Sequence, residues 1–182
     1  MKLGDARRTR RLIKLVEDLS AQPTGSIPLA CGGWTETKAA YRRLDNPALD
    51  WQQVLEVHTE RTSEQMRDQP VVLCLQETTE LDFSSQPGMA GLGRLNYEAR
   101  QGWYVHPTLT VTPAGVALGV IDAWIWARGP KDQPQVKEST RWVEGYAIVA
   151  DLAEQMPNTR LVYIADREGD LRELMDAVQQ RG

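Results

Sequence analysis

The chain has 182 residues, 41% of them hydrophobic and 25% charged, and a formal net charge of −4. This composition is typical of a soluble globular protein with one domain, or with a small domain followed by part of a second. No stretch approaches the roughly 18 consecutive apolar residues of a membrane span, and the first residues have no apolar core of the signal-peptide kind. We therefore expect a cytoplasmic protein.

A net negative charge argues against nucleic-acid binding, but the charge is unevenly placed along the chain. Residues 1–16 hold six basic side chains and one acidic side chain, a local balance of +5. Salt screening confines the effect of each charge to about 8–10 Å, so local clusters decide whether a surface contacts phosphates. The N-terminal segment is therefore a candidate nucleic-acid-binding surface.

Residues 1–68 are predicted to form an all-helical module. Leu12, Leu15 and Leu19 fall at helical spacing and predict a helix over about residues 5–20. The polar stretch at residues 22–26 ends it. A second helix, with Thr35 as its N-cap, is predicted to reach about Leu44, and a third covers about residues 50–66.

Residues 69–182 are predicted to form an α/β domain. Apolar and alternating runs predict strands at residues 71–75, 103–111, 116–125 and 161–165, the middle two joined by a hairpin turn at 112–115. Loops are expected at residues 88–93 and 129–137, and helices at 138–155 and 170–179. The order strand, hairpin, helix, strand, helix indicates a mixed sheet, so the fold class is α/β, or α+β over the whole chain.

Two acidic residues follow the two runs that look like buried strands. Each of them comes after a run of five apolar residues, Asp166 directly and Glu77 after the intervening Gln76. If those strands are central neighbours, both carboxylates emerge where active sites tend to form. Paired carboxylates suit Mg²⁺, which prefers oxygen ligands, and two such ions catalyse phosphodiester cleavage. A strand-terminal acid can equally cap the next helix or face solvent.

Basic and aromatic residues share faces of the first two predicted helices. Residues three or four apart on a helix are neighbours, which groups the basic residues 7, 8 and 11 and, on the second helix, residues 38, 41 and 42. These side chains suit phosphate contact and stacking, although a solvated face, or a core position for the aromatic ones, is the alternative. The candidate DNA-binding residues are Arg7, Arg8, Arg11, Trp34, Lys38, Tyr41 and Arg42.

The two histidines have ordinary interpretations. His58 is expected to be a packing or surface residue of the third helix, and His106 a strand residue, because neither has a Cys or His partner at metal-ligand spacing.

Several segments, in order along nearly the whole chain, resemble the DDE-type transposases of bacterial insertion sequences. They are LGDARRTRRL at residues 3–12, KAAYR at 38–42, QETT at 76–79, GWYVH at 102–106, KES at 137–139 followed by Trp142, and DREGD at 166–170.

The resemblance implies a DNA-binding domain over residues 1–68 and, over residues 69–182, the N-terminal part of a ribonuclease-H-like catalytic domain. It also implies dimers that act at the nucleoid and cut and paste DNA at the terminal inverted repeats of a mobile element. Two Asp and one Glu of the family hold two Mg²⁺ or Mn²⁺ ions. Asp166 matches the second Asp, and Arg7, Arg8 and Arg11 match the basic face that contacts end DNA.

Two departures from the family bear on activity. Glu77 replaces the first Asp, and a shift of about 1 Å in the carboxylate can cost about 10²-fold in rate. The family's catalytic Glu lies downstream of the segment that matches residue 182. We therefore expect a truncated transposase that is inactive by itself, with a DNA-binding regulator or inhibitor of transposition, a non-functional remnant, and a small nuclease using Glu168 or Asp170 as alternatives.

Overall fold

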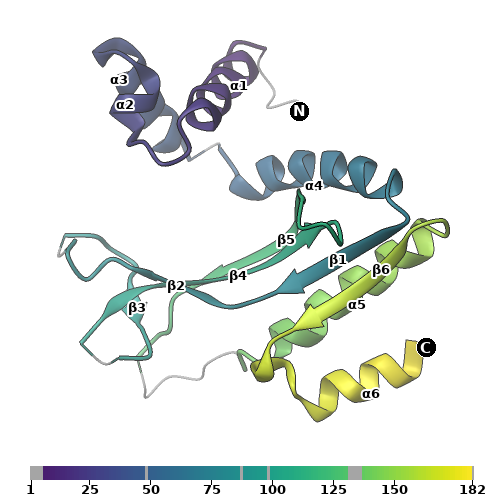
Figure 1. Ribbon diagram of the computed structural model, residues 1–182. Coiled ribbons are helices and arrows are strands. Elements are labelled where there is room, and N and C mark those ends of the chain that lie inside the picture. Colours follow the sequence, from purple (N-terminus) through teal and green to yellow (C-terminus); the bar gives the residue numbers. More distant parts are fainter. Residues whose placement is uncertain (1–5, 48, 87, 98, 131–136, 182) are drawn as a thin grey trace. The chain divides into compact units, whose positions relative to one another are not determined.

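The computed structural model describes residues 6–47, 49–86, 88–97, 99–130 and 137–181. The chain divides between Val57 and His58 into two compact units (Figure 1). We predicted a boundary after residue 68. The division falls earlier because the second half of the fourth helix packs with the sheet that follows it.

The N-terminal unit is helical, as predicted. It contains α1 (Ala6–Ala21), α2 (Ile27–Cys31) and α3 (Trp34–Leu44), and α4 (Trp51–Arg67) begins within it. Leu15, Cys31 and Ala40, one from each of the first three helices, form its buried core.

Two local features of this unit differ from the prediction. Helix α2 was not predicted. Its Pro28 lies in the first turn, where a missing N–H costs nothing. The N-cap of α3 is Gly33 rather than Thr35. Helix α3 therefore begins two residues earlier than the Thr35 cap implied, and Trp34 is its first residue.

The second unit is built around one mixed sheet. Its strands are β1 (Val71–Gln76), β2 (Thr79–Asp82), β3 (Gly93–Arg94), β4 (Gln101–Val111), β5 (Ala117–Trp126) and β6 (Arg160–Ala165). The long strand β4 is antiparallel to β1 and β2 along one edge and to β3 and β5 along the other. Strand β6 then pairs with β1 in parallel.

The strands that carry the predicted hairpin match the pattern in the sequence. Every second residue of β4 is buried, which is the period expected of a sheet with one covered face. Gly115 takes a positive φ of 81° in the turn between β4 and β5, and its N–H bonds the carbonyl of Thr112. The β4–β5 register shifts twice, after Thr108 and after Thr110.

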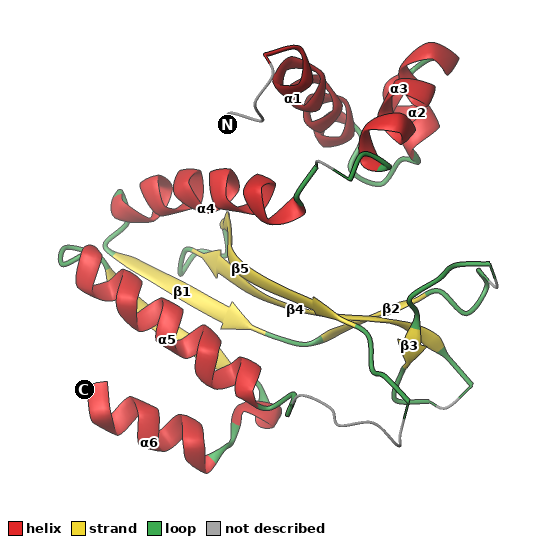
Figure 2. Cartoon of the chain, turned by 180° about the vertical axis from the view of Figure 1, so that it is seen from behind, coloured by secondary structure: helices red, strands yellow, loops and turns green. Residues whose placement is uncertain are grey.

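Helix α5 (Thr140–Gln155) runs along β1 and β6 and is followed, beyond β6, by α6 (Arg172–Arg181), as Figure 2 shows. Val149 of α5 packs with Val72 and Cys74 of β1 in the main core. A short 3₁₀ helix, Arg167–Gly169, joins β6 to α6. Helix α5 therefore covers the two strands that are followed by Glu77 and Asp166.

The second half of α4 docks on the irregular part of β5. Nε2 of His58 accepts a hydrogen bond from the backbone N–H of Val120 at 3.0 Å, and the hydroxyl of Thr59 donates to the carbonyl of Ile121 at 3.3 Å. Gly119, at φ +152°, leaves the room that Thr62 occupies. His58 is thus an exposed residue of α4, within the prediction of a packing or surface residue, and its ring satisfies the backbone N–H of Val120.

The α/β fold class is confirmed, with a helical N-terminal region followed by a mixed sheet and helices. One prediction about the sheet was wrong: the strand at residues 161–165 is not a central, fully buried one. In the described sheet β6 pairs only with β1 and lies at the edge, and its residues are partly exposed. Of the predicted loop at 129–137, residues 131–136 fall outside the described residues. None of the described helices combines the length and apolarity needed to cross a bilayer.

Candidate functional site

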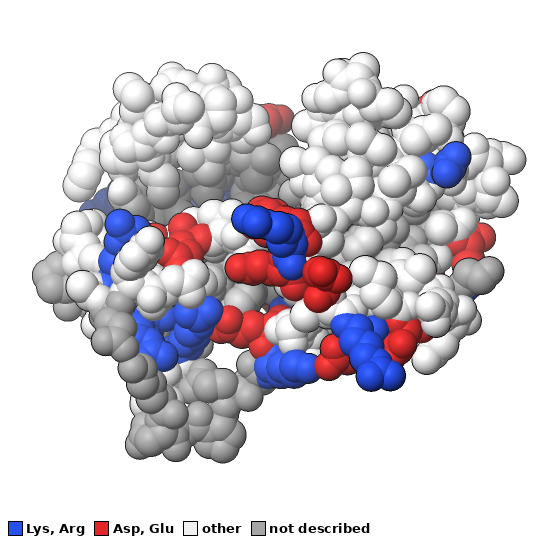
Figure 3. Space-filling view, turned by 60° about the horizontal axis from the view of Figure 1, so that its bottom comes forward, with Lys and Arg blue, Asp and Glu red and all other residues white. Residues whose placement is uncertain are grey.

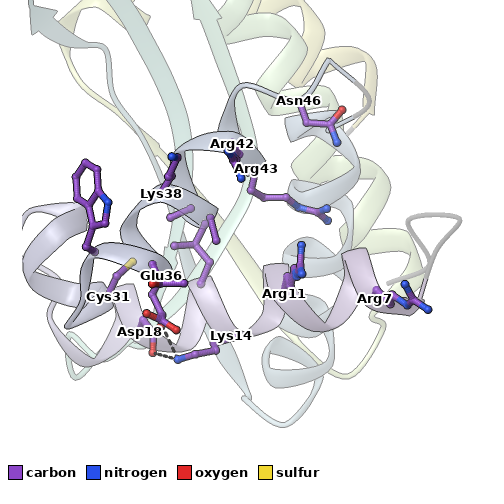
Figure 4. A pocket seen from close by; sticks show the side chains of 15 residues that line it. Arg7, Arg11, Lys14, Asp18, Cys31, Glu36, Lys38, Arg42, Arg43 and Asn46 are labelled. Atoms are coloured by element: carbon purple, nitrogen blue, oxygen red, sulfur yellow. Dashed lines mark hydrogen bonds and ion pairs between the residues drawn. The ribbon is translucent and has the colours of Figure 1, made fainter.

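A groove of about 900 Å³ lies within the N-terminal unit, between α1 and α3. Two rows of basic side chains line it, Arg7, Arg11 and Lys14 along α1 and Lys38 and Arg42 along α3 (Figure 4). The α1 positions recur at intervals of four and three residues, which places them on one face of that helix. The groove therefore gathers positive charge that lies in two separate stretches of sequence.

One end of the groove is neutralised by acids. Nζ of Lys14 lies 3.0 and 2.9 Å from the two carboxylate oxygens of Asp18, and Glu36 also lines the groove. The hydrogen bond to Asp18 raises the pKa of Lys14, with a smaller effect from Glu36. Lys14 is therefore committed to an internal partner, and Arg11, Lys38 and Arg42 contribute positive charge to the groove.

The aromatic candidates are exposed rather than buried. Trp34 is 77% exposed and lines the groove, whereas Tyr41 is 46% exposed and does not belong to the lining. Neither is a core residue. Arg8 lies in α1, but its side chain falls outside the described part of the chain. The structure thus brings Arg7, Arg11, Trp34, Lys38 and Arg42 to one groove.

Residues 1–49, which contain every residue of this groove, match a family model described as transposase DNA-binding. The N-terminal segment is a transposase DNA-binding domain. Its partner is DNA, in keeping with a groove lined by arginine and lysine side chains. The family match thus covers the N-terminal segments of the sequence that resemble transposases.

The second unit brings the two predicted acids to the same end of adjacent strands. Gln76 and Ala165 are the last paired residues of the parallel strands β1 and β6, so Glu77 and Asp166 follow side by side in register. Both residues are exposed. Glu77 Oε1 accepts a hydrogen bond from its neighbour Thr78 N at 3.1 Å, and Asp166 Oδ1 caps the 3₁₀ helix by accepting from Glu168 N at 2.8 Å. Asp166 thus caps the 3₁₀ helix through Oδ1, and its Oδ2 takes no part in the cap.

A buried histidine lies beneath this pair. His106 is 1% exposed, and its Nδ1 lies 2.7 Å from the hydroxyl oxygen of Thr78. Its ring meets the ring of Trp142 edge to face, with 4.6 Å between centroids. Burial, with a smaller contribution from the charge of Arg141, lowers the pKa of His106 to about 4, although the carboxylate of Asp166 acts in the opposite direction. His106 is therefore a neutral imidazole near pH 7.

Glu77 and Asp166 offer carboxylate oxygens, which are ligands that hard cations prefer. Two carboxylates at one sheet edge are the ligands that Mg²⁺ uses together with water and substrate phosphates. Across the residues that the structure describes, no group of three or more His, Cys, Asp or Glu side chains is placed to hold a metal ion. Among the described residues, Glu77 and Asp166 are therefore not joined by the third carboxylate of a two-ion centre.

Charge elsewhere is mixed in sign. On the face drawn in Figure 3, red and blue side chains lie next to one another rather than gathering into a patch of one sign. Ion pairs of the second unit account for several of the charges, among them Lys137 with Glu173 at 2.6 Å and Arg172 with Asp176 at 3.9 Å. The DNA-binding groove differs from that face because basic side chains outnumber the two acidic ones, Asp18 and Glu36, in its lining.

Sequence reasoning missed the residues under the acid pair. His106 was expected to be an ordinary strand residue because no metal-ligand spacing surrounds it, and Trp142 was noted only within the segments that resemble the transposase family. A usable signal was present: His106 falls at a position of β4 that alternation places on the buried face. A histidine at a buried position needs a polar partner, and Thr78 is that partner.

Proposed function

We propose that this protein binds the terminal inverted repeats of a mobile DNA element through the groove of its DNA-binding domain and that it belongs to cut-and-paste DNA transposition. The observation that carries the proposal is the double row of basic side chains in one groove of the matched segment. Arg7 and Arg11 on α1 and Lys38 and Arg42 on α3 are side chains of the kind that contact DNA phosphates and fix a protein on the duplex. Trp34 offers a flat, exposed surface for sugars or bases.

The binding test uses the full chain and labelled duplexes that carry the inverted repeats flanking its coding region. Fluorescence anisotropy over a range of salt concentrations gives both the affinity and its salt slope. Arg11→Ala and Arg42→Ala should each weaken binding and reduce the slope of log K against log salt by about one. Asp18→Asn, which releases Lys14 from its ion pair, should steepen the slope by a similar amount.

Arg61→Ala provides the matched control. Arg61 is 72% exposed on α4, outside the groove, and pairs with Glu64. Its loss should leave the affinity and the salt slope unchanged. Binding that stays at the wild-type level in both groove variants at every salt concentration would contradict the proposed interface.

For the second unit we propose a ribonuclease-H-like domain in which Glu77 and Asp166 belong to a phosphodiester-cleaving centre. Support comes from the arrangement of the sheet, with a hairpin antiparallel to β1 and a helical crossover to the parallel strand β6. Support also comes from the register, which carries both acids to one end of neighbouring strands. Glu77 and Asp166 would hold the divalent ion, Mg²⁺ or Mn²⁺. Such an ion, when bound, polarises the phosphodiester and lowers the pKa of bound water.

Mn²⁺ binding, followed by electron paramagnetic resonance or calorimetry, tests this centre without requiring activity. Glu77→Gln and Asp166→Asn should each weaken Mn²⁺ binding by at least about tenfold, because each removes one of two charged oxygen ligands. Glu60→Gln, at an exposed site on α4, is the control and should bind as wild type does. Wild-type protein that does not bind Mn²⁺, or acid variants that bind it equally well, would contradict the proposed centre.

The separation of the two sites favours a second candidate function. The groove is built entirely from residues between positions 7 and 46, so DNA binding does not depend on the acid pair. A protein of this kind can regulate transposition by occupying element ends, or by pairing with a complete transposase, without cutting DNA. Tight binding of the inverted repeats with no Mg²⁺-dependent nicking identifies this regulator, and nicking that Asp166→Asn abolishes identifies the nuclease.

A further inference from the structure

The two turns that carry Glu77 and Asp166 rest on the same pair of buried rings. We propose that His106 and Trp142 form a positioning pair that fixes the spacing between the two carboxylates and thereby sets the affinity for a divalent cation. This inference depends on the proposed metal centre. Neither ring is a ligand, so the pair acts through the backbone turns that it supports.

The first contact runs from His106 to Glu77. His106 is held on the buried face of β4, and its Nδ1 bonds the hydroxyl of Thr78 at 2.7 Å. Thr78 follows Glu77, and its backbone N–H donates to Glu77 Oε1 at 3.1 Å. The imidazole therefore fixes Thr78, and Thr78 in turn orients the carboxylate of Glu77.

The second contact runs from Trp142 to the turn after Asp166. Trp142 is 3% exposed in the first turn of α5, and its carbonyl accepts a hydrogen bond from the Tyr163 hydroxyl at 3.2 Å. The indole lies against Gly169, because a Cβ added there would stand 3.3 Å from Trp142 Cε3 and closer still to Ala165. Asp166 caps this turn, so the indole fixes the position of the turn, and the turn then orients the Asp166 carboxylate.

The two contacts are coupled because the rings touch each other. The His106 and Trp142 planes are nearly perpendicular, at 86°, with centroids 4.6 Å apart. This edge-to-face geometry is a favoured aromatic arrangement, and buried rings have no free volume into which to shift. A change in either ring therefore moves a carboxylate-bearing turn. Groups that orient metal ligands commonly change metal affinity by about 10–100-fold when they are lost.

The experiment measures Mn²⁺ affinity in the full chain for His106→Phe, Thr78→Val and the double variant. His106→Phe keeps an aromatic ring against Trp142 and removes the hydrogen bond, and Thr78→Val removes the same bond from the other side with little change in shape. Each should weaken Mn²⁺ binding by about tenfold or more. The double variant should be no weaker than the single variants, because all three lack one shared bond.

A matched control separates positioning from general loss of stability. Thr110 is 0% exposed on the same face of β4, and its hydroxyl donates to the carbonyl of Gly119 at 2.9 Å. Thr110→Val should lower the melting temperature and leave the Mn²⁺ affinity at the wild-type value. His106→Asn, whose amide stands near the place of Nδ1, should recover part of the affinity lost in His106→Phe.

The outcomes distinguish this inference from the proposal it rests on. If Mn²⁺ binding depends on Glu77 and Asp166 but Thr78→Val and His106→Phe bind as wild type does, the positioning pair is refuted and the metal centre stands. A loss of affinity in Thr110→Val equal to that in Thr78→Val also refutes it. Wild-type protein without Mn²⁺ affinity refutes the metal centre and this inference together. Thr78→Val carries the test alone if His106→Phe does not fold.

Discussion

Gly145 on α5 offers the sharpest test of how the helix is held against the sheet. A Cβ at this position would overlap the side-chain amide of Gln76, the last residue of β1. That amide donates from Nε2 to the carbonyl of Arg141 at 3.2 Å, and its oxygen accepts a hydrogen bond from the Tyr163 hydroxyl. Gly145→Ala therefore forces either the amide or the helix to move.

Opposing effects decide how much Gly145→Ala changes the free energy of unfolding. Alanine is favoured over glycine within a helix by about 1 kcal/mol. Overpacking a buried contact costs about 1–3 kcal/mol, and displacing a buried amide from its partners costs about 1–3 kcal/mol more. The free energy of unfolding of the sheet unit should therefore fall by about 3 kcal/mol.

The measurement is urea unfolding of the full chain, followed by far-ultraviolet circular dichroism and tryptophan fluorescence. Gly88→Ala is the control, because a Cβ there has open space around it. It should leave stability unchanged or raise it slightly. Gly145→Ala combined with Gln76→Ala should be no less stable than Gln76→Ala alone, since the overlapping atoms are gone. A Gly145→Ala variant as stable as wild type would refute the packing argument.

Two further predictions concern His106 and Gly119. The folded-state pKa of His106, about 4, lies below its ordinary value of 6.5. The contribution of the neutral His106 side chain to the free energy of unfolding is therefore complete above pH 6.5 and is lost as the pH falls toward 4. Between pH 7 and pH 5 this group should therefore lower the unfolding free energy of the wild type by about 2 kcal/mol. Matched denaturant titrations of His106→Phe should lack that loss. Equal pH dependence in the two proteins would contradict the assignment. Gly119→Ala combines a φ of +152° with overlap on Thr62, so it should lower unfolding free energy by about 3 kcal/mol and loosen α4 from β5. Hydrogen exchange at the Val120 amide reads this out directly, with Thr62→Ala as a partial rescue, and protection that stays at the wild-type level would count against it.

The sequence predicted those elements whose pattern is set by burial. Residues 103–111 alternate because one face of β4 is covered, and residues 6–21 repeat at helical spacing because Leu12 and Leu15 face a core. The short strands β2 and β3 carry no such pattern, since the partner strand β4 holds them in place rather than their own apolar faces. Helix α2 is hard to predict because it contains Pro28. Proline is tolerated in the first turn of a helix but breaks the helix in its interior.

The candidate sites were predictable to different degrees. Helical spacing alone grouped Arg7 with Arg11 and Lys38 with Arg42, but only the fold shows that the two helices face the same groove. Spacing also singled out Glu77 and Asp166, whose strands are parallel neighbours in register. His106 and Trp142 could not be paired from sequence, because they come from β4 and α5 and meet only when the helix packs on the sheet.

Strand β4 pairs with four others, β1, β2, β3 and β5, and buries five alternate residues along one face. Deleting or inserting one residue inside it would turn every side chain beyond that point to the opposite face. His106 would leave the core and an apolar neighbour would replace it beneath Thr78. Viable insertions and deletions in relatives should therefore avoid residues 101–111 and collect in the turns on either side.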